Sequence, residues 1–89
     1  MAVQRTVEMK NKRGLHARAS AKFVTLASGV GAEVQVEKDG SSVCGTSIMG
    51  LMMLGAAYGD TITISAEGDG AEEAVAALAE LVEAKFGEE

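Results

Sequence analysis

The stretch AEVQVEKDGSSVC (residues 32–44) sets the fold class of this chain. Alanine and valine alternate with charged and amide side chains over residues 32–37, so a strand here would bury one face and expose the other. Asp39-Gly40 follows, a pair typical of the tight turn in a β-hairpin, and residues 41–44 make the short return strand. The stretch therefore predicts an antiparallel hairpin with one face against a core.

Two further segments show the apolar alternation of β-strands. Residues 2–9 predict one strand and residues 61–66 predict another, each with a single apolar face. The inward side chains expected are Val3, Val7 and Met9 in the first strand and Ile62 and Ile64 in the second. Together with the hairpin, these segments give four strands.

Three segments show helical spacing of apolar residues instead. Residues 16–28 predict a helix that ends at the glycines Gly29 and Gly31, residues 47–54 a short apolar helix, and residues 71–86 an amphipathic helix. The buried stripe expected in the first helix is Ala17, Ala21, Val24 and Ala27–Ser28, with Phe23 and Leu26 alongside; in the last helix it is Val75, Leu78, Val82 and Phe86.

The predicted order of elements is βαββαβα. Helices packed on one face of an antiparallel sheet suit this order. We therefore predict an α+β open-faced β-sandwich, a four-stranded antiparallel sheet with three helices on one face. The 89 residues correspond to a single domain spanning residues 1–89. So short a chain buries only roughly 60–65% of its unfolded surface, which favours a function at the surface over an enzyme with a deep pocket.

The charge of the chain is unevenly distributed. The net charge is −5, yet no acid lies between Glu8 and Glu33. This interval holds five of the eight basic residues: Lys10, Lys12, Arg13, Arg18 and Lys22. Such a positive region predicts acidic partners, although a solvated basic loop is the simpler alternative. Nucleic acid is disfavoured as a partner, because the net charge is negative and only 3% of the residues are aromatic.

Neither a membrane span nor an oxidising compartment is indicated by the sequence. The uncharged stretch 40–59 is interrupted by glycine, serine and threonine. The one cysteine, Cys44, cannot form an internal disulfide, and residues 1–13 lack the apolar centre of a signal peptide. We therefore expect a cytoplasmic protein without membrane insertion.

The one histidine, His16, lies in GLHARAS (residues 14–20), where the first helix should begin. The unpaired amides of Ala17 and Arg18 would point toward the imidazole, and the helix dipole makes this position attractive to anions. The same positive field disfavours the imidazolium form and leaves a neutral, nucleophilic ring. Arg18 adds a planar donor group that suits phosphate oxygens. The combination predicts a histidine that accepts a phosphoryl group.

Other interpretations of His16 are a simple helix cap and a satisfied surface residue. Histidine is an uncommon N-cap compared with serine or aspartate, so a capping role alone leaves its presence unexplained. A metal site is not predicted, because a lone histidine and a distant lone cysteine do not make a ligand set. A hydrolase triad is also disfavoured, because the chain has no second histidine to act as a base.

Two segments together resemble a known family. GLHAR (residues 14–18) and SIMGLM (residues 47–52) are similar to the two signature segments of HPr, the histidine-containing phosphocarrier protein of the bacterial phosphoenolpyruvate phosphotransferase system. The resemblance covers essentially the whole chain. It implies the open-faced sandwich and a phosphoryl carrier that needs no cofactor and has no enzymatic turnover of its own. One departure is Ala19, where the family commonly has proline. This variant is similar to nitrogen-branch members, so the resemblance implies either sugar uptake or a regulatory cascade.

The resemblance also implies roles for single residues. His16 would be phosphorylated on Nδ1 by phosphorylated enzyme I, ultimately from phosphoenolpyruvate, and would pass the group to an enzyme II A component. Arg18 and the backbone amides of Ala17 and Arg18 would hold the phosphate. Ser47 would be the site that an HPr kinase/phosphorylase modifies, although its default role is the N-cap of the second helix.

The apolar residues of the second helix exceed what one buried helix face can hold. Part of them should pack in the core, and the remainder should form a docking patch beside His16. The docking residues expected are Lys22, Ile48, Met49, Leu51 and Met52. We expect a monomer. The alternative function is a regulatory binding module, which docks on partners according to its phosphorylation state without onward transfer.

Overall fold

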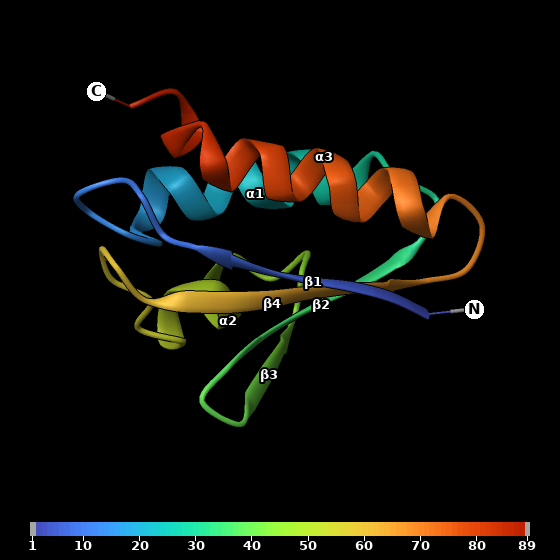
Figure 1. Ribbon diagram of the computed structural model, residues 1–89, viewed down its shortest axis with the longest axis horizontal. Helices are drawn as coiled ribbons and strands as arrows, with labels where there is room; N and C mark the ends of the chain where they lie inside the picture. Colours follow the sequence, from blue (N-terminus) through green and yellow to red (C-terminus); the bar gives the residue numbers. More distant parts are fainter. Residues whose placement is uncertain (1, 89) are drawn as a thin grey trace.

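The computed structural model describes residues 2–88, and its elements follow the predicted order (Figure 1). They are β1 (Ala2–Glu8), α1 (Ala17–Ser28), β2 (Glu33–Lys38), β3 (Ser41–Cys44), α2 (Ile48–Met53), β4 (Thr61–Glu67), α3 (Ala71–Glu83) and a short 3₁₀ turn, η1 (Lys85–Gly87). The predicted open-faced sandwich with a four-stranded antiparallel sheet is confirmed.

The sheet has the strand order β1-β4-β2-β3, and every neighbouring pair is antiparallel. The last strand of the sequence, β4, therefore lies between the first and second strands. The predicted hairpin turn is confirmed, because Asp39 and Gly40 both have positive φ angles, 51° and 85°. This backbone matches the tight turn that suits the right-handed twist of two paired strands.

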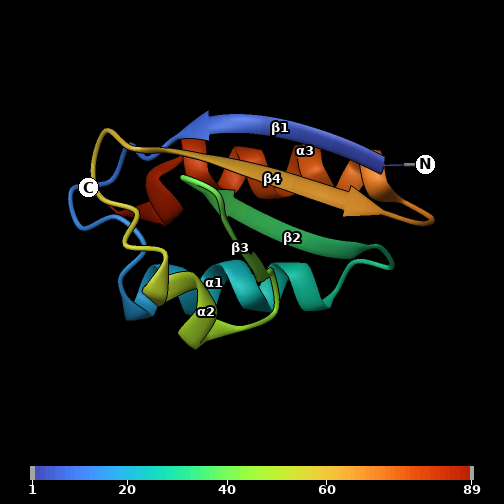
Figure 2. The ribbon, with the colours of Figure 1, turned by 90° about the horizontal axis from the view of Figure 1, so that it is seen from below.

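The helices cover one face of the sheet and leave the other face open. Figure 1 shows α1 and α3 side by side above the strands, and Figure 2 shows α2 next to α1. The core between the layers is one cluster that is largely aliphatic, with two phenylalanines, Phe23 and Phe86. The predicted inward residues Val34, Val36, Ile62 and Ile64 are all buried in this cluster.

The buried stripe predicted for α1 is wrong in part. The residues of α1 that are buried are Ala19, Ser20, Phe23 and Ala27, whereas Ala17 and Ser28 are exposed and Ala21 and Val24 are only half-buried. Phe23 has the largest side chain of this helix and is fully buried. Its burial turns the face of α1 that carries Phe23 toward the core. Ser20 can share this face because its hydroxyl donates a hydrogen bond to the Leu15 carbonyl over 3.2 Å.

The last helix is shorter than predicted. It ends at Glu83, and Lys85, Phe86 and Gly87 then have φ angles of 61°, 55° and 78°. This left-handed turn doubles the chain back toward the start of α1. Phe86 is buried all the same, with 1% of its surface exposed. The apolar spacing of the sequence is therefore compatible both with a continued helix and with the observed turn.

A close contact between two backbone segments fixes the loop before α1. Gly14 has a φ angle of 63°, and a Cβ atom at this position would overlap the Ala56 carbonyl oxygen. The next residue, Leu15, donates its amide hydrogen to that same oxygen over 2.9 Å. Nearby, the Met9 amide donates to the Asp60 carbonyl over 2.7 Å. The loop that carries His16 is therefore held to the segment after α2 by backbone hydrogen bonds.

This contact predicts a large loss of stability on Gly14→Ala. A non-glycine residue with positive φ costs about 1–2 kcal/mol, and the overlap with Ala56 adds about 1–3 kcal/mol. The matched control is Gly40→Ala, because Gly40 also has a positive φ but has open space where a Cβ would lie. Urea unfolding should show a clearly larger loss for Gly14→Ala than for Gly40→Ala. Equal losses would mean that the contact with Ala56 does not constrain the loop.

Candidate functional site

His16 lies at the N-cap of α1, as the sequence predicts. Its backbone is extended, with φ −75° and ψ −179°, and its carbonyl accepts the first helical hydrogen bond, from the Ser20 amide over 2.9 Å. The amide of Arg18 donates to Nδ1 of the His16 ring over 3.3 Å. The imidazole therefore takes the capping role that a serine or aspartate side chain usually has.

The other ring nitrogen of His16 contacts a carboxylate from the opposite end of the chain. Nε2 lies 2.5 Å from Oε2 of Glu88, and the two side chains are 22% and 21% exposed. The side-chain amide of Asn11 donates to the second carboxylate oxygen, Oε1, over 3.1 Å. Sequence reasoning missed both Asn11 and Glu88, because no pattern in the chain relates residue 88 to residue 16.

The pKa of the Glu88 carboxyl is lowered in this setting. The main cause is the hydrogen bond with His16; partial burial opposes the shift, and the hydrogen bond from Asn11 reinforces it. The carboxyl is therefore held in its ionised form, an acceptor for the Nε2–H group.

The hydrogen bonds of the ring assign its proton. A backbone amide can only donate, so Nδ1 accepts from Arg18 and must carry a lone pair. The ring proton then lies on Nε2, where Glu88 accepts it. This neutral form has its nucleophilic lone pair directed at the start of α1, where the amides without intrahelical partners would meet an anion.

The His16 ring lines an open hollow of about 400 Å³. The residues that line it are Lys12, Arg13, His16, Arg18, Lys22, Gly87 and Glu88. Four of these side chains are basic, which makes the hollow attractive to anions although the protein as a whole is acidic. Among residues 2–88, no carboxylate lies within 4.0 Å of the Arg18 guanidinium. Its donors are therefore available to an anion at Nδ1.

Ser47 caps α2, as predicted. Its hydroxyl oxygen accepts a hydrogen bond from the Gly50 amide over 3.0 Å. The neighbouring Thr46 does not share the cap, because its hydroxyl is paired with the Cys44 thiol over 3.2 Å. That pairing lowers the pKa of the Cys44 thiol.

The predicted docking patch is only partly exposed. Leu51 has no exposed surface and packs in the core, so it cannot contact a partner in this conformation. The reason is helical phase: the face of α2 that carries Leu51 packs inward, and the other faces point to solvent. The large apolar side chains that are exposed are Ile48, Met49, Met52, Met53 and Tyr58, with Met49 at 72% and Met53 at 80%. Met53 and Tyr58 are not among the docking residues predicted from the sequence.

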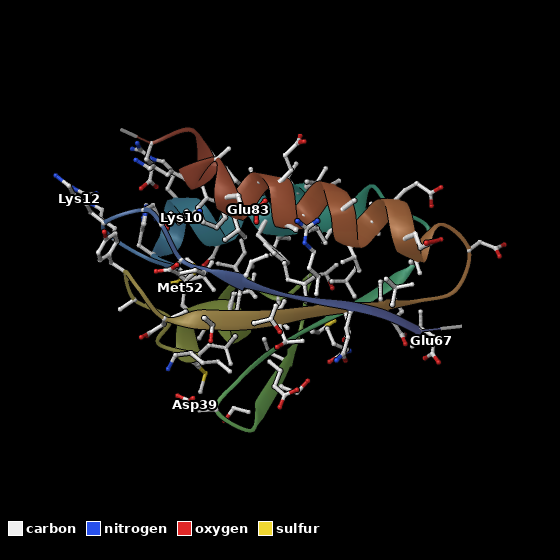
Figure 3. All side chains as sticks on the ribbon, viewed as in Figure 1. Lys10, Lys12, Asp39, Met52, Glu67 and Glu83 are labelled. Carbon is white, nitrogen blue, oxygen red and sulfur yellow. The ribbon has the colours of Figure 1, made fainter. Side chains whose placement is uncertain are left out.

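The basic loop and the apolar patch lie toward the same end of the molecule. Figure 3 places Lys10, Lys12 and Met52 toward one end and Glu67 at the other.

Among the described residues, no group of three or more His, Cys, Asp and Glu side chains is arranged to hold a metal ion. None of the described helices has the length and apolar character needed to cross a membrane.

Comparisons with known proteins agree on one family. Residues 3–84 match the protein-family model PTS-HPr, described as the PTS HPr component phosphorylation site. The chain is 49% identical over 86 residues to the phosphocarrier protein HPr of Neisseria meningitidis, covering 97% of each sequence. It is 46% identical over 81 residues to the HPr-like protein Crh of Halalkalibacterium halodurans, covering 91% of this chain and 96% of that protein.

A solved structure supports the same assignment. The HPr of Thermoanaerobacter tengcongensis superposes with a TM-score of 0.93 and 52% sequence identity, and 98% of each chain is covered. The fold, the match to the family model and the curated relatives all agree. The chain therefore belongs to the HPr family of phosphocarrier proteins of the phosphotransferase system.

Proposed function

We propose that Nδ1 of His16 is the atom that carries the phosphoryl group. The observation that carries the proposal is the hydrogen-bond pattern of the ring, which leaves the Nδ1 lone pair at the start of α1 and the proton on Nε2. An incoming phosphoryl group would replace the ring as acceptor of the Arg18 amide. The Ala17 amide and the Arg18 guanidinium would supply further donors to its oxygens.

The transfer step balances without a cofactor. The lone pair of Nδ1 forms a bond to phosphorus while the bond from phosphorus to the donor's leaving atom breaks, and the electron pair of that bond stays on the leaving atom. The ring of His16 keeps its Nε2 proton and becomes a phosphoimidazolium cation beside the Glu88 carboxylate. Onward transfer reverses these events toward the next acceptor. We propose that partners supply most of the catalysis and that the chain has no turnover of its own.

The partners in this proposal are enzyme I as donor and an enzyme II A component as acceptor. The exposed part of the patch, Ile48, Met49 and Met52, with the basic Lys22, is proposed as the docking surface. A basic rim around an apolar centre gives fast and transient association with acidic partners. We further propose that residues 1–89 form one domain that acts as a monomer. The cytoplasm is the proposed location, since a single cysteine needs no oxidising compartment.

Ser47 is proposed as a regulatory phosphorylation site for an HPr kinase/phosphorylase. Its hydroxyl lies at the N-terminus of α2, half-buried and bonded to the Gly50 amide. A phosphate there would add about −1.5 to −2 charges beside the proposed docking surface. The helix start tolerates this charge, whereas an acidic partner is repelled by it.

The alternative function is a regulatory module that binds partners without passing the phosphoryl group onward. The similarity to Crh, described as the catabolite repression HPr of Bacillus subtilis, supports this alternative. A panel of enzyme II A components separates the two, because a carrier loses its label to at least one of them. The identity of that acceptor also distinguishes sugar uptake from a regulatory cascade.

The first test is labelling of His16. The protein incubated with enzyme I and ³²P-phosphoenolpyruvate should gain an acid-labile label, and His16→Ala should abolish it. Arg18→Ala should slow labelling by about tenfold, because a charge-assisted contact to the phosphoryl group is lost. Arg5→Ala on β1, which removes the same charge from a residue that does not line the hollow, serves as the control. A label that persists in His16→Ala rejects the proposed site.

The second test concerns Ser47. Ser47→Asp should slow phosphoryl acceptance by about tenfold through repulsion of an acidic partner, while stability changes by less than about 0.5 kcal/mol, since aspartate is also a good N-cap. The control is Ser41→Asp, which adds the same charge on β3. Initial rates of labelling and urea unfolding measure the two effects. If Ser41→Asp slows labelling as much as Ser47→Asp, the effect belongs to net charge and not to the docking surface.

A further inference from the structure

The turn after α3 carries Glu88 to His16 at a cost in backbone strain. Lys85 and Phe86 are L-residues in the left-handed region, with φ angles of 61° and 55°, where the Cβ atom comes close to the backbone and the conformation is strained. Such strain persists only where the surroundings hold it. Here the Phe86 ring is buried, its carbonyl accepts a hydrogen bond from Lys22 Nζ over 2.7 Å, and the Glu88 amide donates to the Lys85 carbonyl over 2.9 Å. The position of Glu88 is therefore built into the fold.

Asn11 holds the carboxylate of Glu88 from the other side. Its side chain is buried, with 1% exposed, and its amide nitrogen donates to the Gly14 carbonyl over 2.8 Å and to Glu88 Oε1 over 3.1 Å. Both donors are used, so the amide is fixed in orientation. Within residues 2–88, its Oδ1 is the one buried side-chain N or O atom without a hydrogen-bond partner, which is costly for stability alone. The arrangement favours a role in holding Glu88.

We propose that Asn11 and Glu88 are a positioning pair for His16: Asn11 fixes the carboxylate, and the carboxylate holds the proton on Nε2, so that Nδ1 presents its lone pair. This inference rests on the proposed function of His16 as the phosphoryl acceptor. It adds two positioning residues, neither of which touches the phosphoryl group.

The charges around the ring give this pair a second effect. When Nδ1 bonds to phosphorus, the ring becomes cationic, and the other side chains that line the hollow include the basic Lys12, Arg13, Arg18 and Lys22. Glu88 is the only carboxylate among the lining residues in the described part of the chain. Its negative charge at Nε2 stabilises the cationic ring against these neighbours. Removal of this charge should therefore reduce acceptance of the phosphoryl group.

The test compares Glu88→Gln, Asn11→Ala and the control Glu80→Gln, which removes the same charge from an exposed position on α3. In NMR spectra of ¹⁵N-labelled protein with a neutral ring, the wild type and the control should show a protected Nε2–H signal. Glu88→Gln should exchange that proton faster with solvent. The maximal rate at which enzyme I labels Glu88→Gln should fall about fivefold, because a charge-assisted hydrogen bond between partly exposed groups is lost. The KM for enzyme I should be unchanged.

Asn11→Ala should show the same two effects in weaker form. In the double variant, the loss should be no larger than in Glu88→Gln alone, because both residues act through one carboxylate. If Asn11→Ala fails to fold, Glu88→Gln alone decides the question. Unchanged proton exchange and an unchanged maximal rate in Glu88→Gln would overturn the positioning pair.

The two proposals fail in different ways. The NMR measurement needs no phosphoryl transfer, so it tests the pair even if enzyme I does not label the protein. Faster Nε2–H exchange in Glu88→Gln without any labelling of the wild type would support the pair and reject the proposed function. Normal labelling of His16 in both proteins with equal exchange would support the function and reject the pair.

Discussion

The close approach of Gly14 to Ala56 is the constraint on which the site depends. Only a residue without a side chain can bring the loop before α1 against the segment after α2, and only there can Leu15 bond to the Ala56 carbonyl. His16 follows one residue later. The His16 ring is thus placed relative to the segment after α2 by backbone hydrogen bonds. Such placement tolerates variation of the surrounding side chains and holds the proposed acceptor atom, Nδ1, near the proposed docking surface on α2.

Nδ1 of His16 has two roles that it cannot fill at the same time: it caps α1, and in the proposed function it bonds to phosphorus. In the free protein Nδ1 caps α1 through the Arg18 amide over 3.3 Å, a long bond for a helix cap. In the proposed phosphorylated form Nδ1 is bonded to phosphorus, so the amide must find another acceptor. A phosphoryl oxygen is a stronger acceptor than the imidazole and carries the negative charge that a helix N-terminus favours. The weak cap is therefore exchanged for a stronger one, and α1 loses nothing when the group is carried.

The strands and the hairpin could be predicted because each is specified by residues that are close together in the sequence. The alternation in residues 32–37 and the Asp39-Gly40 pair specify a hairpin without reference to the rest of the chain. The apolar spacing of the last helix could not show where it ends, since Phe86 is buried both in a continued helix and after the observed turn. The position of His16 before a helix could be read from the sequence. Its contact with Glu88 could not, because two segments 72 residues apart meet there through the left-handed turn.

The direction from which a partner can reach His16 follows from what covers each side of the ring. The turn at η1 and the carboxylate of Glu88 cover the Nε2 side, where Lys22 bonds to the Phe86 carbonyl and ties the turn to α1. The Nδ1 side is left to the start of α1. In the proposed function, a phosphoryl donor therefore reaches Nδ1 from the start of α1, and α2 with its exposed methionines packs against α1. Burial of Leu51 in the core and exposure of Met49 and Met53 have the same cause, since a six-residue helix at the edge of a small core can bury only one face. The faces that remain exposed carry the flexible, apolar side chains of methionine. Such side chains suit a carrier that must fit a donor and an acceptor in turn.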